Sequence, residues 1–121
     1  MLLNCLAVGV GGFFGSILRY LLSNALPNDA FPWTTLAINI VGSFVLALVV
    51  GLVLKGVMPD DQVSLMLRVG FCGGFTTLST FSSETLSLLN NGAYGEAIAY
   101  ALATVVLCVL AAFAGGWVAR A

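Results

Sequence analysis

The residues between 70 and 84 carry most of the chemistry that this sequence offers. The stretch reads GFCGGFTTLSTFSSE, with two adjacent glycines, six hydroxyl side chains within eight residues, and then the carboxyl group of Glu84. Hydroxyl groups donate and accept hydrogen bonds without carrying charge. Thr77, Phe81 and Glu84 are spaced i, i+4, i+7 and share one helix face, with Thr80 beside them. This face predicts a polar track for an ion.

The composition indicates that these groups lie in a lipid bilayer. The chain has 121 residues, of which 60% are hydrophobic and 7% charged, and a chain this short cannot bury so much apolar surface. Four Lys and Arg residues are too few to make a phosphate-binding surface, which excludes nucleic acid as a partner. The sequence has no His, the commonest general base, and its three Cys have no zinc or disulfide spacing, so we do not expect an enzyme.

The hydrophobic segments predict an all-α membrane protein with one transmembrane domain over residues 1–121. The four expected spans are about 2–22, 33–54, 64–89 and 97–118. Three of the four basic residues lie on the side of the termini, a small surplus that points to cytoplasmic termini and leaves insertion in both orientations open. Four short helices are too few to enclose a path for ions, so we expect a twofold dimer. The two subunits would be antiparallel if the chain inserts in both orientations.

The third span is expected to be broken near its middle, at Gly73 and Gly74, because paired glycines weaken a helix. A break at membrane depth frees backbone carbonyls, which suit a small hard cation. The competing interpretation is that the hydroxyls simply bond back to carbonyls of their own helix. It explains one or two of them, but six beside a double glycine and an acid favour a pathway.

Other polar residues fall inside the spans, where they are costly and usually face a bundle interior or a water-filled cavity. Arg19 lies near the end of the first span, so it either faces the interior or reaches the interface. Asn39 could make one hydrogen bond between helices. Glu84 lies too far from either end of its span to reach water easily.

Three motifs resemble those of the Fluc/CrcB fluoride channel family. They are GGFFGSILRY in the first span, TTLAINIVGS in the second and GFCGGFTTLSTFSSE in the third, so the resemblance covers nearly the whole chain. It implies an antiparallel dimer with two pores that passively exports fluoride across the cell inner membrane of a bacterium. It also implies a structural sodium ion at the dimer centre, bound by the backbone carbonyls of Gly73 and Thr76 from each subunit.

The resemblance further assigns roles to individual residues. Asn39 matches the pore-lining Asn of the family, Glu84 the Glu of the third helix, and Arg19 the Arg of the first span, to which we give a structural role. The expected fluoride pathway comprises Asn39, Phe81, Thr77, Ser79, Thr80, Glu84 and Thr104. Fluoride is tightly hydrated, and hydroxyls, an amide and the positive edge of a phenyl ring could replace its water without a full charge that would trap it.

Two positions depart from the family pattern. Relatives usually carry two phenylalanines three residues apart in the third motif, whereas this chain has Leu78 and Phe81. In the fourth span only Thr104 is a clear donor, followed by Cys108 and Ala112. Either the chain conducts as a homodimer with a reduced set of groups, or it forms a heterodimer with a related subunit that supplies the rest.

Two rival functions remain. A small proton-coupled exporter would use Glu84 as its proton carrier, but this acid lies among hydroxyls in span three and not in span one with an aromatic cage. A non-conducting membrane assembly subunit would explain the small residues spaced four apart, such as Gly11 and Gly15 or Gly70 and Gly74, which let helices pack closely, but not the hydroxyl run.

Overall fold

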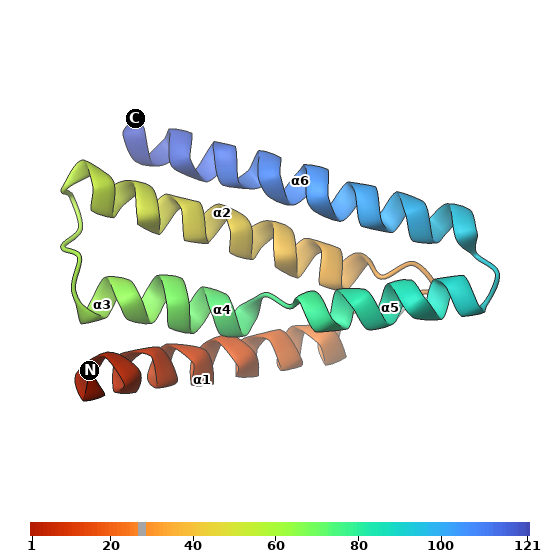
Figure 1. Ribbon diagram of the computed structural model, residues 1–121, viewed down its shortest axis with the longest axis horizontal. Helices are drawn as coiled ribbons and strands as arrows, with labels where there is room; N and C mark the ends of the chain where they lie inside the picture. Colours follow the sequence, from red (N-terminus) through yellow and green to blue (C-terminus); the bar gives the residue numbers. More distant parts are fainter. Residues whose placement is uncertain (27–28) are drawn as a thin grey trace.

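The computed structural model describes residues 1–26 and 29–121, and within them the regular secondary structure is entirely helical. The elements are α1 (Leu2–Ala25), α2 (Trp33–Lys55), α3 (Gln62–Leu65), a π-helical turn η1 (Met66–Phe71), α4 (Cys72–Phe75), α5 (Leu78–Asn90) and α6 (Tyr94–Arg120). The helices run along one common direction, and both termini lie at the same end (Figure 1). The all-helical expectation is confirmed, and Pro27 and Asn28 of the expected first loop lie outside the described residues.

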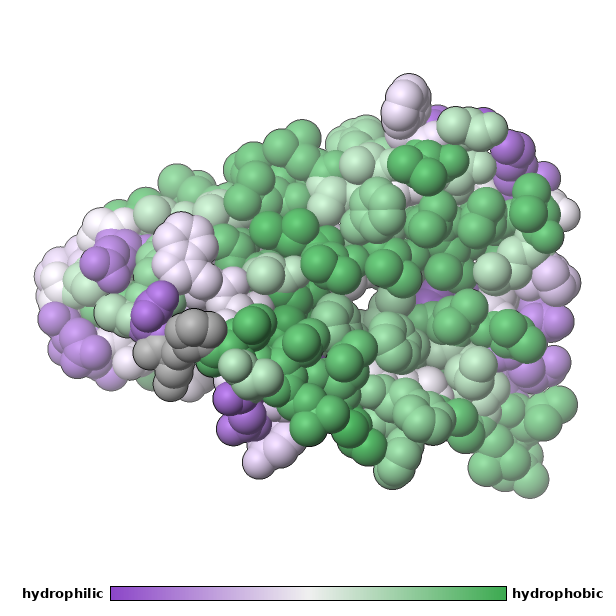
Figure 2. Space-filling model, turned by 180° about the vertical axis from the view of Figure 1, so that it is seen from behind, coloured by the Kyte–Doolittle hydropathy of each residue, from purple (hydrophilic) through white to green (hydrophobic). Residues whose placement is uncertain are grey.

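Three of the described helices, α1, α2 and α6, are long and apolar enough to cross a membrane. Hydrophobic side chains cover most of the visible surface, and hydrophilic ones gather mainly toward the two ends (Figure 2). The chain is therefore a multi-pass membrane protein. The third expected span, 64–89, is not one helix: it consists of the continuous helical run 62–75 and the separate helix α5.

Local signals explain where several helices begin and end. Asp61 caps α3, because its side chain accepts hydrogen bonds from the backbone N–H groups of Val63 at 2.9 Å and Ser64 at 3.4 Å. Gly56 ends α2 with a left-handed φ of 82°, a conformation that glycine adopts without strain. These residues fix the start of α3 and the end of α2.

Helix α1 packs closely against η1 and α4 through small residues, as the glycine spacing predicts. A Cβ atom on Gly74 would lie 2.8 Å from the Gly12 carbonyl oxygen, and one on Gly15 would overlap the Phe71 carbonyl. The two backbones can approach this closely only because these positions have no side chain. On the other side of the bundle, α2 packs along α6 (Figure 1).

The helix break lies at Thr76 and Thr77, not at the glycine pair, which corrects the sequence expectation. Thr76 has φ −83° and ψ 159°, and Thr77 has φ −152° and ψ 122°, so both are extended. Gly73 and Gly74 stay helical within α4, and Gly74 serves close packing against α1. The chain breaks after them because Thr77 caps α5, its side chain accepting the Thr80 N–H at 3.1 Å.

A cavity at the helix break

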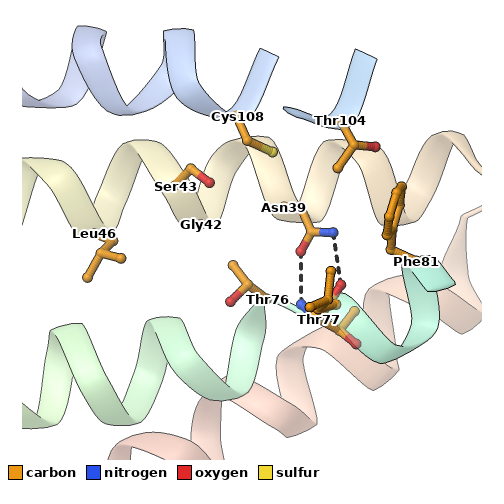
Figure 3. Close-up of a pocket in the computed structure, with 10 residues that line it drawn as sticks. Asn39, Gly42, Ser43, Leu46, Thr76, Thr77, Phe81, Thr104 and Cys108 are labelled. Atoms are coloured by element: carbon orange, nitrogen blue, oxygen red, sulfur yellow. Dashed lines mark hydrogen bonds between the residues drawn. The ribbon is translucent and has the colours of Figure 1, made fainter. Parts of the chain in front are cut away.

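A cavity of about 240 Å³ lies beside the break, between α2, α5 and α6 (Figure 3). Its walls come from all three helices and from the extended segment. The lining residues are Asn39, Gly42, Ser43, Leu46, Thr76, Thr77, Leu78, Phe81, Thr104 and Cys108. Four expected pathway residues thus meet here: Asn39, Thr77, Phe81 and Thr104.

Asn39 joins α2 to the break through a closed pair of hydrogen bonds with the backbone of Thr77. Asn39 Nδ2 donates to the Thr77 carbonyl at 3.0 Å, and the Thr77 N–H donates to Asn39 Oδ1 at 2.8 Å (Figure 3). The amide therefore satisfies both main-chain groups of a residue that has left the helix. Because Nδ2 carries two hydrogens, one remains for a ligand in the cavity.

The hydroxyl groups after the break divide into two kinds. Thr77 Oγ1 faces its own new helix, where it accepts the Thr80 N–H and donates to Thr80 Oγ1, each at 3.1 Å. Ser79 Oγ lies 3.4 Å from Thr77 Oγ1. Ser79 and Thr80 adjoin Thr77 in this way but do not line the cavity.

The hydroxyls of Thr76 and Ser82 bond back to nearby backbone carbonyls, as the competing interpretation of the hydroxyl run predicts. Thr76 Oγ1 donates to the Cys72 carbonyl at 2.7 Å, and Ser82 Oγ donates to the Leu78 carbonyl at 3.0 Å. Both hydroxyls are used within their own stretch of chain, so the run of six is not a uniform track of donors.

Thr104 differs from these, because its Oγ1 atom is buried and has no hydrogen-bond partner among the described residues. A buried hydroxyl without a partner costs free energy, and each such group in a native protein calls for an explanation. Thr104 lines the cavity from α6, in the same region as Phe81 from α5 (Figure 3). A ligand in the cavity would supply the missing partner.

Glu84 lies outside the cavity lining, in a polar cluster one turn further along the helices. Its Oε1 accepts from the Tyr100 hydroxyl at 2.9 Å, and its Oε2 accepts from Thr35 Oγ1 at 3.0 Å. Both partners are buried. Sequence reasoning missed Thr35 and Tyr100, although they lie four residues before Asn39 and Thr104 and continue their polar faces by one turn.

Arg19 supports the end of α4. Its Nε donates to the Gly74 carbonyl at 3.0 Å, across from α1. In an unbroken helix the Leu78 N–H would reach this carbonyl. Arg19 thus provides a donor at the point where the helix stops, consistent with the structural role that we expected for it.

The carbonyls of Gly73 and Thr76 fit the requirements of a small hard cation. The N–H groups that would reach them in an unbroken helix are diverted: Thr77 N–H donates to Asn39 Oδ1 at 2.8 Å, and Thr80 N–H to Thr77 Oγ1 at 3.1 Å. A Cβ atom on Gly73 would meet nothing within 4 Å, so this face of α4 is open. The described residues contain no cluster of three His, Cys, Asp or Glu that could hold a metal, which leaves carbonyl oxygens as candidate ligands.

Fold and site together define a multi-pass helical membrane protein with a cavity of uncharged lining residues at a broken helix. Family comparison makes this specific: the profile of "CrcB-like protein, Camphor Resistance (CrcB)" matches residues 6–116, and the chain belongs to this family. The resemblance seen in the three motifs is thereby confirmed.

Relatives of known name cover almost the whole chain. A protein of Geobacter sulfurreducens is 43% identical over 118 residues, which is 95% of each chain. One of Agrobacterium fabrum is 44% identical over 117 residues, or 94% of each, and one of Methanocaldococcus jannaschii is 40% identical over 116 residues, covering 95% of this chain and 93% of that protein. Each of these three relatives bears the name "Fluoride-specific ion channel FluC".

Proposed function

We propose that this chain forms a fluoride-selective ion channel. The observation that carries the proposal is the Thr104 hydroxyl, which has no hydrogen-bond partner among the described residues and lines a cavity without charged residues. The chain is also 40–44% identical to the three relatives named as fluoride channels. The channel lets fluoride leave the cytoplasm down its gradient, which lowers the concentration of a toxic ion. Its place is the inner or plasma membrane of a bacterium, as a multi-pass protein.

Fluoride that binds in this cavity exchanges part of its hydration water for the groups that line it. The Thr104 hydroxyl, the second Nδ2 hydrogen of Asn39 and the ring edge of Phe81 offer partial positive charge in return. None of them carries a full charge, so the ion is bound firmly enough to enter and weakly enough to leave. Both carboxyl oxygens of Glu84 accept hydroxyl hydrogens, and the group lies outside the cavity lining.

The conducting unit in this proposal is an antiparallel dimer. The cavity is bounded by three helices of one chain, and Leu78 on its wall is 75% exposed, so a second subunit is needed to complete the passage. A homodimer is the simplest arrangement. The exposed leucine favours a second candidate, a heterodimer in which a related subunit contributes the aromatic ring that Leu78 lacks.

A structural sodium ion at the dimer centre belongs to the same proposal. The Gly73 and Thr76 carbonyls of each subunit would hold it, since both have lost their helical donors. The ion would supply positive charge that neutralises carbonyl oxygens brought together by the two breaks. Asn39 and Arg19 keep the break in its extended form on either side.

Liposome flux separates this proposal from its rivals. The purified chain is reconstituted into vesicles loaded with potassium fluoride, and external fluoride is recorded after a potassium ionophore is added. We expect rapid efflux at equal pH on both sides. Efflux that requires a proton gradient would indicate the proton-coupled exporter based on Glu84. A chain without flux, alone and when co-purified with a Phe-bearing relative, would indicate the non-conducting assembly subunit.

A further inference from the structure

Tyr100 is clamped between two aromatic rings from different parts of the chain. Its side chain is fully buried, with 0% exposed. The Phe81 ring centroid lies 5.0 Å away at an interplanar angle of 51°, and that of Phe31 lies 5.5 Å away at 76°, an edge-to-face arrangement. The Tyr100 hydroxyl donates to Glu84, so the clamped ring also fixes that bond.

Phe31 is the outer member of this stack and does not line the cavity. It precedes α2 and packs partly buried against the cluster formed by Leu36, Leu88, Ala97 and Tyr100. The Tyr100 ring lies between Phe31 and the ring of Phe81, and Phe81 does line the cavity. Phe31, which lies outside the membrane-spanning helices, is thus connected to the Phe81 ring by one intervening side chain, that of Tyr100.

We infer that Phe31 is a positioning residue that sets anion selectivity, by holding Tyr100 and hence the edge of Phe81 in place. This inference rests on the proposed fluoride channel. Discrimination of fluoride from larger halides requires donors that hold their positions, because loose donors adjust to a larger ion. Loss of the Phe31 ring leaves Tyr100 with one aromatic neighbour and gives Phe81 freedom to tilt.

The test compares three variants in vesicles. Phe31→Leu keeps an apolar side chain but removes the ring, and Phe31→Tyr restores it. Trp117→Leu is the matched control, because Trp117 is 69% exposed and its ring pairs with no other aromatic ring among the described residues. We expect Phe31→Leu to lower the fluoride-to-chloride permeability ratio about three- to tenfold, and the other two to stay within about twofold of wild type.

A second readout does not depend on conduction. Ring-labelled tyrosine NMR of the purified protein gives signals from three tyrosines, and Tyr100→Phe assigns the one of interest. Phe31→Leu should shift the Tyr100 signal and leave those of Tyr20 and Tyr94 unchanged. If Phe31→Leu does not fold, Phe31→Met takes its place in both measurements.

The outcomes separate this inference from the proposed function. If folded Phe31→Leu has the same fluoride-to-chloride permeability ratio as the wild-type protein, and the wild-type protein conducts fluoride, the inference is wrong and the proposed channel function is unaffected. An unchanged Tyr100 signal overturns it as well. If the wild-type protein passes no fluoride either as a homodimer or as a heterodimer with a related subunit, the proposed function is wrong. The selectivity role of Phe31 is then wrong as well.

Discussion

The side chain of Asn39 and the backbone of Thr77 hold each other through two hydrogen bonds, at 3.0 and 2.8 Å, across the gap between α2 and the broken helix. The Thr77 N–H donates to Asn39 in place of the Gly73 carbonyl that it would reach in an unbroken helix, and the pairing places an amide at the wall of the cavity. The break and the pathway therefore depend on the same residue, and substitutions at Asn39 should affect both.

Asn39→Asp should reduce fluoride efflux at least about a hundredfold. A carboxylate still accepts from the Thr77 N–H but cannot donate to the Thr77 carbonyl, and it places negative charge at the wall. Efflux from vesicles measures the effect, and Asn4→Asp, at an exposed site on α1, is the matched control. Wild-type currents in Asn39→Asp would remove Asn39 from the pathway.

Thr104→Val should lower fluoride flux about tenfold while leaving the thermal stability equal to wild type or higher. Valine has nearly the same shape, and the hydroxyl it removes has no partner within the described residues. Thr85→Val is the control, because the Thr85 hydroxyl already donates to the Phe81 carbonyl at 2.8 Å and lies outside the cavity lining, so its loss should leave the flux unchanged. A fall in stability without a change in flux would mean that Thr104 is structural.

Phe81→Ile should slow fluoride about tenfold or more, because this chain has Leu78 where a second ring is usual and so offers one ring edge at the cavity. Efflux rates at matched protein density measure it. Phe13→Ile, on the exposed face of α1, is the control for loss of an aromatic ring. Unaltered flux in Phe81→Ile would show that the ring edge is not used.

Leu78→Phe should raise fluoride flux several-fold in the chain purified alone, since it restores an aromatic side chain on the cavity wall. Leu86→Phe adds a ring at another exposed position of α5 and should change nothing. Flux that remains low after Leu78→Phe, but rises when a related Phe-bearing subunit is added, would establish the heterodimer.

The sequence predicts the membrane class, the helical architecture and the existence of a break, because hydrophobic length and an unusual polar run are local properties. It misplaces the break, since Gly73 and Gly74 weaken a helix only where nothing holds them. Here Gly74 is held helical by contact with Gly12, and Asn39, distant in sequence, offers Thr77 its alternative bonds. Tertiary partners decide where a weakened helix opens.

The candidate site shows the same division. Asn39, Thr77, Phe81 and Thr104 could be chosen by residue type and meet at one cavity. Glu84 shares a helix face with Thr77 and Phe81, yet it lies outside that cavity because Thr35 and Tyr100 bind its carboxyl oxygens. The partner of a polar group depends on neighbouring helices, and spacing within one helix does not reveal it.

The reversal potential of the reconstituted protein tests the central claim most directly. Currents are recorded across a planar bilayer with independent gradients of fluoride, chloride and protons. The account predicts that the current reverses at the fluoride equilibrium potential, and that this reversal potential stays the same when the chloride or proton gradient is changed. A reversal potential that follows chloride or protons would contradict it.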